Sequence, residues 1–426
     1  MADPAPKGHL MRSRHLVVLP AVIAAATLLL TGCGNRAGDT STPAAKASCV
    51  DTSGSTVKVG SVYSLSGSTA LNEVPINDSV KMAVDEINTS GGILGKQLQL
   101  ITEDGASEPT VFAEKAQKLV SSDCVAATFG GYTSASRKAM LPVFEDDNAL
   151  LYYGQQYEGL EASKNIFYTG ATANQQIVPA LDYLKQKGVR SLYLVGSDYV
   201  FPRTSNAIVK AYAAANGITI KGEDYVPLGG TDFSTVVNKI RTAGADAVFN
   251  VVVGDSLTSF FREYNSAGLK AATMPVMSMV VGEQEVASIG AQNLVGQPTT
   301  AAYFETVDTP ANKKYVADFT AKYGQNRVTA DSMAGAYAAV YAWKAMVEKA
   351  KSFDTAAIQQ AAGGVTVEAP EGTITVDGTN HHITKTTRIG VIQADGQIST
   401  EWQSPGVVAP DPFLTSYPWA KGLQTG

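Results

Sequence analysis

Three runs of sequence follow one another near the start of the chain: VKVGSVY (Val57–Tyr63), DSVKMAVDEIN (Asp78–Asn88) and QLQLITE (Gln97–Glu103). The first and third are short runs of the kind found in strands, whereas the second has its apolar residues at helical spacing. Gly91-Gly92 follows the second run, and glycine commonly ends a helix. The segment therefore predicts a strand–helix–strand unit, from which parallel sheets are built.

The same alternation continues toward the C-terminus and starts again after Gly170. Further strands are expected at Val125–Phe129, Leu150–Tyr153, Ser191–Val195, Thr219–Tyr225, Ala247–Val252 and Met274–Met279. Helices are expected at Thr110–Ser121, Ala311–Tyr323, Asp331–Ala350 and Asp354–Ala361, from Ser134, Asn174, Thr204 and Phe233, and after Asp255. Near the C-terminus, the alternating runs Thr373–Val376, Thr384–Ile392 and Gln397–Trp402 predict β-hairpins instead. The fold class is therefore α/β, with the rhythm of a doubly wound parallel sheet occurring twice.

The composition indicates a folded, acidic protein. The 426 residues are enough for two domains with separate cores, and 45% of them are hydrophobic. Charged residues make up 17%, below the roughly 25% of an average soluble domain, and the formal net charge is -6. A negative surface repels polyphosphate, and the sequence has no basic stripe with interleaved aromatic residues, so we expect no nucleic-acid partner.

The first 33 residues have the pattern of an export signal. Arg12 and Arg14 precede the uncharged run Leu16–Leu30, which is shorter than a membrane-spanning helix requires. It leads into Leu30-Thr31-Gly32-Cys33, which resembles the bacterial lipobox, whose cysteine becomes the lipidated N-terminus. We expect residues 1–32 to be a lipoprotein signal peptide, so that the protein is exported and lipid-anchored at the outer face of the cell membrane. The alternative is a signal anchor in which Cys33 is incidental.

Two further cysteines, Cys49 and Cys124, are expected to form a disulfide. Each lies just before an expected strand, Val57–Tyr63 and Val125–Phe129. If these strands are neighbours, both thiols lie near the same edge of the sheet. In an exported protein an isolated pair of cysteines is more often bridged than free.

No catalytic or metal-binding motif stands out. The sequence lacks a Gly-x-Ser-x-Gly elbow, a Walker loop and a Gly-x-Gly-x-x-Gly fingerprint. The histidines after Cys33 are His381 and His382, adjacent in an expected hairpin, where such a pair is more often at the surface than catalytic. No cluster of cysteines or carboxylates gives them metal-ligand spacing. We expect no enzymatic activity, no metal and no cofactor.

The loops that follow the strands are candidate ligand sites, because open α/β sheets bind ligands beyond the carboxyl ends of their strands. Gly130–Ser136 leads into a helix whose first N–H groups can donate to a ligand carbonyl or carboxylate. Tyr152–Tyr157 and Gly196–Pro202 place tyrosines at two further strand ends, where their rings can stack on a planar ligand. Gly254-Asp255-Ser256 follows a fourth strand. Ordinary helix caps explain the hydroxyl and carboxylate residues equally well.

Motifs in these loops and elsewhere resemble one family. Asp85–Asn88 and Gly91–Gly95 look like the first helix and turn of type I periplasmic binding proteins of the branched-chain amino acid class. More specific matches are Gly131–Lys138, Tyr157–Gly159, Asn165–Tyr168, Asn174–Gln176, Gly196–Tyr199, Val307–Pro310, Glu368–Gly372, Asn380–His382 and Gln403–Pro405. Together they resemble the urea and short-chain amide subgroup, most closely the substrate-binding lipoproteins of urea ABC transporters.

The resemblance implies two α/β lobes joined by three crossings, with the ligand trapped in the cleft between them. The crossings are expected near Gly170–Thr172, Ala301–Tyr303 and Val367–Gly372. The expected parts are a lipid-anchored tether at 33–55, lobe 1 at 56–170 and 303–367, lobe 2 at 171–302 and 368–414, and a C-terminal tail at 415–426. The resemblance also implies that urea, or a similar short-chain amide, is delivered to the permease subunits of an ABC importer.

The resemblance further implies a set of ligand contacts: Tyr132, Ser134, Tyr153, Gln155, Tyr199, Asp255 and Glu283. Urea is flat and neutral, with one carbonyl acceptor and four N–H donors. Backbone N–H groups at the Ser134 helix start would serve its carbonyl, while carboxylates and tyrosine oxygens would accept its N–H groups. Three alternatives stay open: a branched-chain amino acid as the ligand, a role as an amide-sensing regulator or receptor component, and an amide hydrolase. The hydrolase is disfavoured because no nucleophile–base pair is found.

Overall fold

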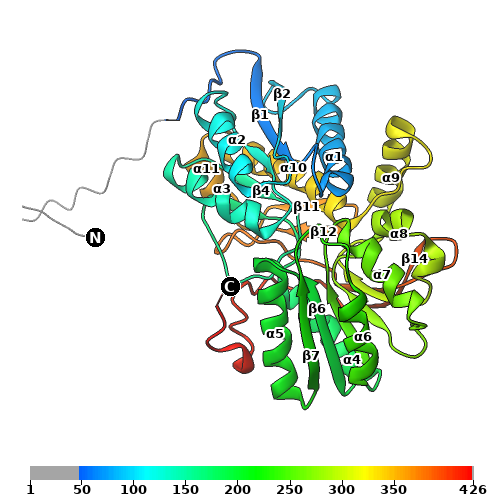
Figure 1. The fold of residues 1–426 in the computed structure, drawn as a ribbon. Helices are drawn as coiled ribbons and strands as arrows, with labels where there is room; N and C mark the ends of the chain where they lie inside the picture. The colour runs from blue at the N-terminus through cyan, green and yellow to red at the C-terminus, as the bar shows by residue number, and fades with distance from the viewer. Residues whose placement is uncertain (1–47, 425–426) are drawn as a thin grey trace, which may run out of the picture. The chain divides into compact units, whose positions relative to one another are not determined.

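The computed structural model describes residues 48–424. They contain two sheets of mainly parallel strands, each flanked by helices, which confirms the expected α/β fold with two lobes (Figure 1). The predicted signal peptide and the lipidation site at Cys33 lie outside the described residues and stay predictions. Over residues 48–424, no helix is long and apolar enough to cross a membrane.

The first sheet has the strand order β2-β1-β3-β4-β5 and is parallel throughout. Its strands are β1 (Thr56–Tyr63), β2 (Gln97–Asp104), β3 (Thr128–Gly130), β4 (Leu151–Tyr153) and β5 (Ile166–Tyr168). The helices between them are α1 (Ala70–Thr89), α2 (Pro109–Ser121) and α3 (Ser134–Asp146). Every residue of β1 from Val59 onward is buried, as expected for a strand covered on both faces.

The second sheet has the order β14-β13-β10-β9-β8-β6-β7. Its parallel strands are β6 (Ser191–Ser197), β7 (Thr219–Val226), β8 (Ala247–Val251), β9 (Val276–Ser278) and β10 (Pro298–Ala301). The antiparallel hairpin of β13 (Arg388–Ile392) and β14 (Ile398–Gln403) extends it beyond β10. The helices of this part are α4 (Ala173–Gln186), α5 (Val200–Asn216), α6 (Ser234–Ala243), α7 (Ser256–Ser266), α8 (Glu283–Ile289) and the short η1 (Ala291–Asn293).

After β10 the chain returns to the first lobe. It forms α9 (Pro310–Tyr323), α10 (Asp331–Ala350), α11 (Thr355–Ala361) and the hairpin of β11 (Thr366–Ala369) and β12 (Gly372–Thr375). Helix α10 packs against α1, β3 and β4. At Gly335 of this helix, an added Cβ would meet the carbonyl oxygen of Gly154 at 2.4 Å, so only glycine allows this approach. The close packing fixes the loop after β4 against the start of α10.

The chain enters the second sheet for the last time later than expected. Residues 367–372, where a crossing was expected, are instead part of the β11–β12 hairpin, which packs on α10. Further on, Val376 bridges Ile383 and His382 bridges Tyr168 of the first sheet. The sequence pattern of alternating residues did not show that β12 pairs with β11, because the pattern predicts a strand but not its partner.

The expectation of a surface histidine pair is wrong, because His381 and His382 are both buried. The His382 ring stacks on Tyr168 with centroids 4.2 Å apart, and its Nε2 lies 2.5 Å from the hydroxyl of Tyr157. The His381 ring stacks on Phe167, also at 4.2 Å. Burial lowers the pKa of His382 to about 4, so the ring is neutral at physiological pH. The two rings pack the segment that follows β12 onto β5.

In the structure, Cys49 and Cys124 form a disulfide with their Cα atoms 5.3 Å apart. It joins the segment before β1 to the segment before β3, and these two strands are neighbours in the first sheet. In the chain-entropy picture, a bridge closing so long a loop contributes on the order of 4 kcal/mol.

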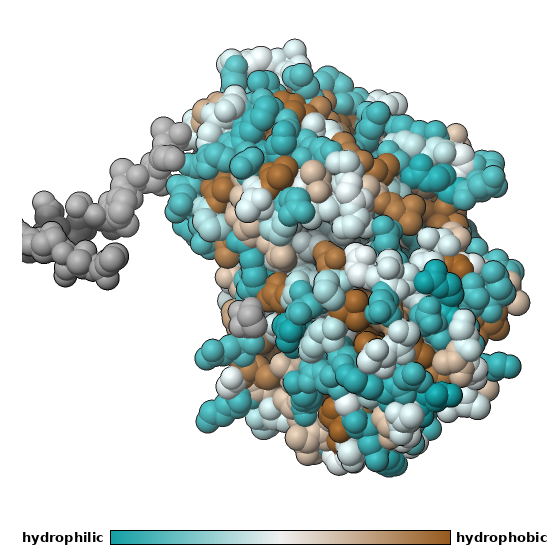
Figure 2. Space-filling view, viewed as in Figure 1, coloured by the Kyte–Doolittle hydropathy of each residue, from teal (hydrophilic) through white to brown (hydrophobic). Residues whose placement is uncertain are grey.

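The surface over the two lobes is mixed in character. On the face shown in Figure 2, hydrophilic residues predominate and hydrophobic ones lie scattered among them. The exposed large hydrophobic residues come from widely separated parts of the chain, for example Leu71, Val295, Val407 and Phe413. Single exposed apolar residues are normal on soluble domains.

Candidate ligand site

A small cavity of about 30 Å³ lies where loops of both lobes meet, and we call it the ligand cavity. Its walls come from the loops after β3 and β4, the segment after β9, the end of β10 and the start of α10. The lining residues are Tyr132, Gln155, Gln156, Met279, Val280, Val281, Gly282, Glu285, Thr300, Ala301, Ala330, Asp331 and Ser332. The carboxyl ends of strands from both sheets thus converge on it, as expected for ligand sites in open α/β sheets.

Two of the predicted ligand contacts are tyrosines, one from each lobe, and they differ in their relation to the cavity. Tyr132 lines it and is only 8% exposed. It follows Gly131, whose positive φ of 82° is a conformation that favours glycine. Tyr199, at the start of α5, is half-buried. Burial raises the pKa of both phenols, and the charge of Tyr199 would further raise that of Tyr132. Both are neutral hydroxyl groups at physiological pH.

Ser134 and Tyr153 are engaged with other protein groups and do not line the cavity. The Ser134 hydroxyl donates to Glu158 at 2.5 Å and accepts from Arg137 at 3.0 Å. The Tyr153 hydroxyl donates to the carbonyl oxygen of Tyr132 at 2.8 Å. These two predicted contacts therefore hold the loop that carries Tyr132.

The two predicted carboxylates lie in different surroundings. Asp255 is exposed at the start of α7 and does not line the cavity. Glu283 is 2% exposed, and its Oε1 accepts from the Glu305 N–H at 2.7 Å. Burial is the main reason that the pKa of Glu283 is raised to about 8; the backbone N–H groups lower it and the charges of Glu305 and Glu285 raise it. Of the seven predicted ligand contacts, the structure brings Tyr132 and Gln155 to the cavity wall, whereas the other five, Tyr199 among them, do not line it.

Glu285 is a cavity residue that the sequence analysis missed. Its Oε2 accepts from the Gly282 N–H at 2.8 Å, and its Oε1 accepts from the side-chain amide of Asn72 in α1. Burial raises the pKa of Glu285. The local signal was present, because a glutamate three residues after a helix cap commonly reaches back to the cap N–H. Nothing in the sequence indicated that Asn72 would lie opposite.

Three further polar residues lie at the cavity wall or behind it: Gln156 and Thr300 line the cavity, and Gln176 does not. The Gln176 amide donates to the carbonyl oxygens of Met279 at 2.8 Å and Thr300 at 3.0 Å. The Gln156 amide also points to Met279, at 3.4 Å. Within the part of the chain that the structure describes, the side-chain oxygens of Gln156, Gln176 and Thr300 accept or donate no hydrogen bond. Buried polar atoms are usually paired, so these unpaired oxygens are available to accept hydrogen bonds from a ligand.

Buried charges hold the crossing segments beside the cavity. Asp331 accepts from the N–H groups of Ala302 and Tyr303, at 3.1 and 2.8 Å. Burial raises the pKa of Asp331 to about 6; nearby Lys385 lowers it and Glu371 raises it. Lys385 donates to both oxygens of Glu371 at 2.7 Å, and both side chains are 1% exposed. The crossings are therefore tied together by fully paired ions at one end of the cavity.

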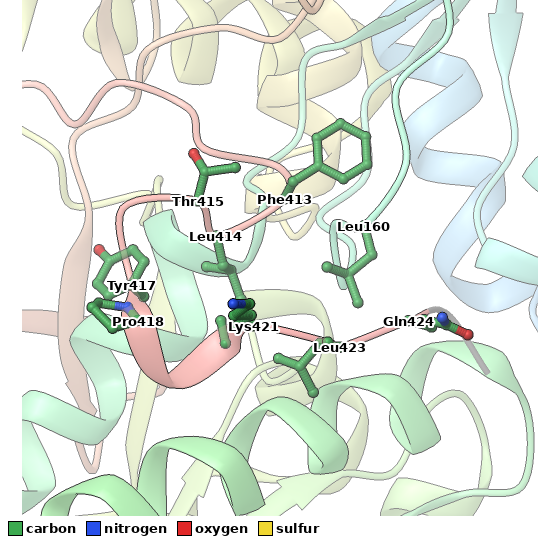
Figure 3. A pocket seen from close by; sticks show the side chains of 11 residues that line it. Leu160, Phe413, Leu414, Thr415, Tyr417, Pro418, Lys421, Leu423 and Gln424 are labelled. Carbon is green, nitrogen blue, oxygen red and sulfur yellow. The ribbon is translucent and has the colours of Figure 1, made fainter.

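A much larger hollow lies elsewhere, between the C-terminal tail and the loop at Leu160 (Figure 3). It is an open groove of about 750 Å³, lined mostly by residues after Phe413. Leu160 and Leu423 extend into the same space, and the lining also includes the polar residues Thr415, Tyr417, Lys421 and Gln424 (Figure 3). It lies away from the carboxyl ends of the strands, so we place the ligand site at the smaller cavity. Across residues 48–424, no group of three or more metal-ligating side chains is found.

Comparison with known proteins supports one family for nearly the whole described chain. Residues 57–418 match the family described as periplasmic binding protein domain. The Leu/Ile/Val-binding protein homolog 6 of Brucella suis is 25% identical over 339 residues, which is 77% of this chain and 85% of that protein. The Leu/Ile/Val-binding protein homolog 8 of Brucella melitensis is 25% identical over 380 residues, which is 83% of this chain and 92% of that protein.

Two solved structures are similar in fold. The solute-binding protein of an ABC transporter from R. palustris, in complex with 4-hydroxybenzoate, has a TM-score of 0.75 and 25% identity. The match covers 82% of this chain and 97% of that one. A branched-chain amino acid transporter substrate-binding protein from Streptococcus pneumoniae, in complex with isoleucine, has a TM-score of 0.72 and 22% identity. The match covers 83% of this chain and 100% of that chain, and it indicates that the two proteins share a fold.

Proposed function

The chain belongs to the periplasmic binding protein family, and we propose that it captures urea, or a similar short-chain amide, for an ABC importer. Its general class is that of the solute-binding proteins of ABC transporters, of the type that includes branched-chain amino acid and benzoate binders. In this proposal the two lobes close over the solute, exclude bulk water and form the surface that the permease subunits recognise.

The chemistry of the ligand cavity carries the choice of ligand. A cavity of about 30 Å³ has room on the order of two water molecules, which suits a very small solute. Its lining residues include the carboxylates of Glu285 and Asp331 and the unpaired oxygens of Gln156 and Thr300, but no lysine, arginine or histidine. Such a wall favours a neutral ligand with several N–H donors, because each buried polar group requires a partner.

We assign roles on this basis. The rings of Tyr132 and Tyr199 would pack against the flat ligand, while Gln155 and Gln156 would bond to its edges. Glu285 would accept one N–H group. Ser134 and Tyr153 would act through the Tyr132 loop, and we assign Asp255 and Glu283 no direct contact.

A branched-chain amino acid is the second candidate, and the observation that favours it is the similarity to the two Brucella proteins. An amino acid needs partners for both a carboxylate and an ammonium group. The cavity wall offers carboxylates for the ammonium but no cation for the carboxylate.

The remaining proposals concern location and activity. We propose that residues 1–33 direct export and lipid anchoring, which disfavours a role as a regulator of a cytoplasmic partner. We also propose that the protein has no enzymatic activity, since its relatives are solute-binding proteins. Steady release of ammonia from urea or acetamide by the purified protein would overturn this.

The test of ligand class is isothermal titration of the purified protein with urea, acetamide, formamide and leucine in turn. Saturable one-to-one binding of urea or a short amide, with no heat from leucine, is the expected result. Binding of leucine with no response to urea would retain the transport role and replace the ligand.

A further inference from the structure

Glu285 is shared by two hollows of the molecule. It lines the ligand cavity, and it also lines a second hollow of about 20 Å³ nearer the surface. The second hollow has Leu71 and Asn72 of the first lobe on one side, and Gly254 and Ser288 of the second lobe on the other. One carboxylate therefore separates the ligand from the outer contact between the lobes.

The hydrogen bonds of Glu285 cross from one lobe to the other. The Gly282 N–H binds its Oε2 at 2.8 Å and fixes the side chain to the start of its own helix, α8. The Asn72 amide, which is 5% exposed in the first turn of α1, binds its Oε1. At the same contact, an added Cβ on Gly254 would lie only 3.4 Å from the Ser68 carbonyl oxygen. The two lobes are thus in close contact where Asn72 meets Glu285.

A carboxylate has about four acceptor positions, and the protein fills two of them here. The others are available to an N–H group inside the cavity. Opening the lobes would separate Asn72 from Glu285 and leave both groups without this bond. A ligand N–H group and the Asn72 amide would therefore both hold the Glu285 carboxylate in its present position. Ligand binding in the cavity and the contact between the lobes would then favour each other, which is a coupling between two sites.

We propose that Glu285 couples ligand binding to lobe closure: it accepts from Asn72 of the opposite lobe only in the closed state, and it accepts from a ligand N–H group with its remaining lone pairs. The hydrogen bond from a ligand N–H group rests on the proposed function. The hydrogen bond from Asn72 rests on the geometry of the two lobes alone.

The test uses Asn72→Asp, which places a second carboxylate against Glu285, and Asn72→Ala, which only removes the bond. Ala287→Ser, at an exposed position on the same helix that lines neither hollow, is the matched control. Small-angle X-ray scattering of the purified protein measures lobe opening, and titration with urea and acetamide measures affinity. Asn72→Asp should increase the radius of gyration and weaken binding about tenfold or more, the loss expected for a hydrogen bond to a charged group. Asn72→Ala should act in the same direction with a smaller effect.

The outcomes separate this proposal from the proposed function. If the original protein binds urea and both Asn72 variants match it in radius and affinity, the coupling is wrong and the function stands. If none of the tested solutes binds but Asn72→Asp still opens the lobes, the ligand assignment fails and the Asn72–Glu285 contact stands. Equal radii with no binding would overturn both. Ala287→Ser should match the original protein throughout.

Discussion

Two groups of buried polar side chains differ in how completely they are paired. In the first lobe the guanidinium of Arg137 is fully buried, and we call it and its partners the arginine network. Its partners are Ser134, Glu158 and Glu161. At the ligand cavity, by contrast, side-chain oxygens are left without partners in the described chain, at Gln156, Gln176 and Thr300. Complete pairing is what a structural support requires, whereas unpaired acceptors suit a site that receives a ligand.

The carboxylates follow the same division. Burial alone would raise the pKa of Glu161, but Arg137 outweighs it and lowers the value to about 2, so the group stays charged. Near the cavity, burial raises the pKa of Glu283 to about 8, and no cation offsets it. Glu161 therefore contributes to the fold as an ion, whereas Glu283 contributes to it as a neutral acid.

The arginine network should show the largest effect. Arg137→Met leaves Glu158 buried without a cation and Glu161 with Lys138 alone, which should lower the free energy of unfolding by about 3–5 kcal/mol. Guanidinium chloride unfolding followed by circular dichroism measures this. The control is Arg203→Met, because Arg203 pairs with Asp198 at the surface and its loss should have a much smaller effect on stability. Equal losses in the two variants would contradict the division drawn above.

The neutral acid should appear as a pH dependence of stability. The pKa of Glu283 in the folded protein, about 8, lies above its ordinary value of 4.5, so the folded state holds the proton more tightly. Its contribution to stability is complete at low pH and is lost as the pH rises through 8, with a slope of up to about 1.4 kcal/mol per pH unit. Thermal unfolding from pH 5 to 9 should show a steeper decline for the original protein than for Glu283→Gln. If the original protein and Glu283→Gln lose stability with pH in the same way, Glu283 is not the source of the pH dependence.

Thr300→Val should weaken the ligand site without weakening the fold. The hydroxyl of Thr300 is buried without a partner in the described residues, so removing it should leave the free energy of unfolding unchanged or slightly higher. Affinity for the amide ligand should fall about tenfold, the worth of one hydrogen bond. Thr128→Val is the matched control, since its hydroxyl is equally buried and unpaired but does not line the cavity. Calorimetric titration showing the same affinity in both variants would count against the cavity assignment.

Tyr153→Phe should give the smallest effect, and it should change both the stability of the fold and the affinity for the ligand. It removes the hydrogen bond to the Tyr132 carbonyl, which should cost about 1 kcal/mol of stability and reduce affinity a few-fold. Tyr264→Phe removes a similar bond to the Met274 carbonyl in the second lobe. It should cost about as much stability with no change in affinity. A change in affinity for Tyr264→Phe but none for Tyr153→Phe would reverse the assignment.

Much of the fold was predictable because long elements have strong periodicity. Helix α10 has the bounds that its apolar spacing predicted, Asp331–Ala350. Strands β5 and β10 were not predicted. Strand β10 begins with a proline, which argues against a central strand, and the apolar run at β5 is isolated, whereas the equally short β3, β4 and β9 lie within longer runs typical of strands. Helix α1 begins at Ala70 rather than Asp78 and continues through Pro75, which lies in its second turn and removes one hydrogen bond of the helix, so the proline did not mark its start.

The cavity was predictable only in part. Tyr132 and Gln155 follow strands, and the rule that places ligands at strand ends applies to them directly. Glu285 and Asn72 are 213 residues apart in sequence, and their contact depends on how the two lobes meet. Asp255 follows a strand as well, but the same packing leaves it exposed outside the cavity. Spacing along a chain does not encode the angle between two lobes.

The bridge between Cys49 and Cys124 determines how the first lobe responds to mechanical load. Strand β1 lies between β2 and β3, and a pull on the residues before Cys49 acting on β1 alone would break its hydrogen bonds one pair at a time. The bridge transmits part of the pull to the segment that leads into β3. Neighbouring strands then share the force, so their hydrogen bonds must fail together rather than in sequence. The first lobe is reinforced at the end of the chain where a tether would pull.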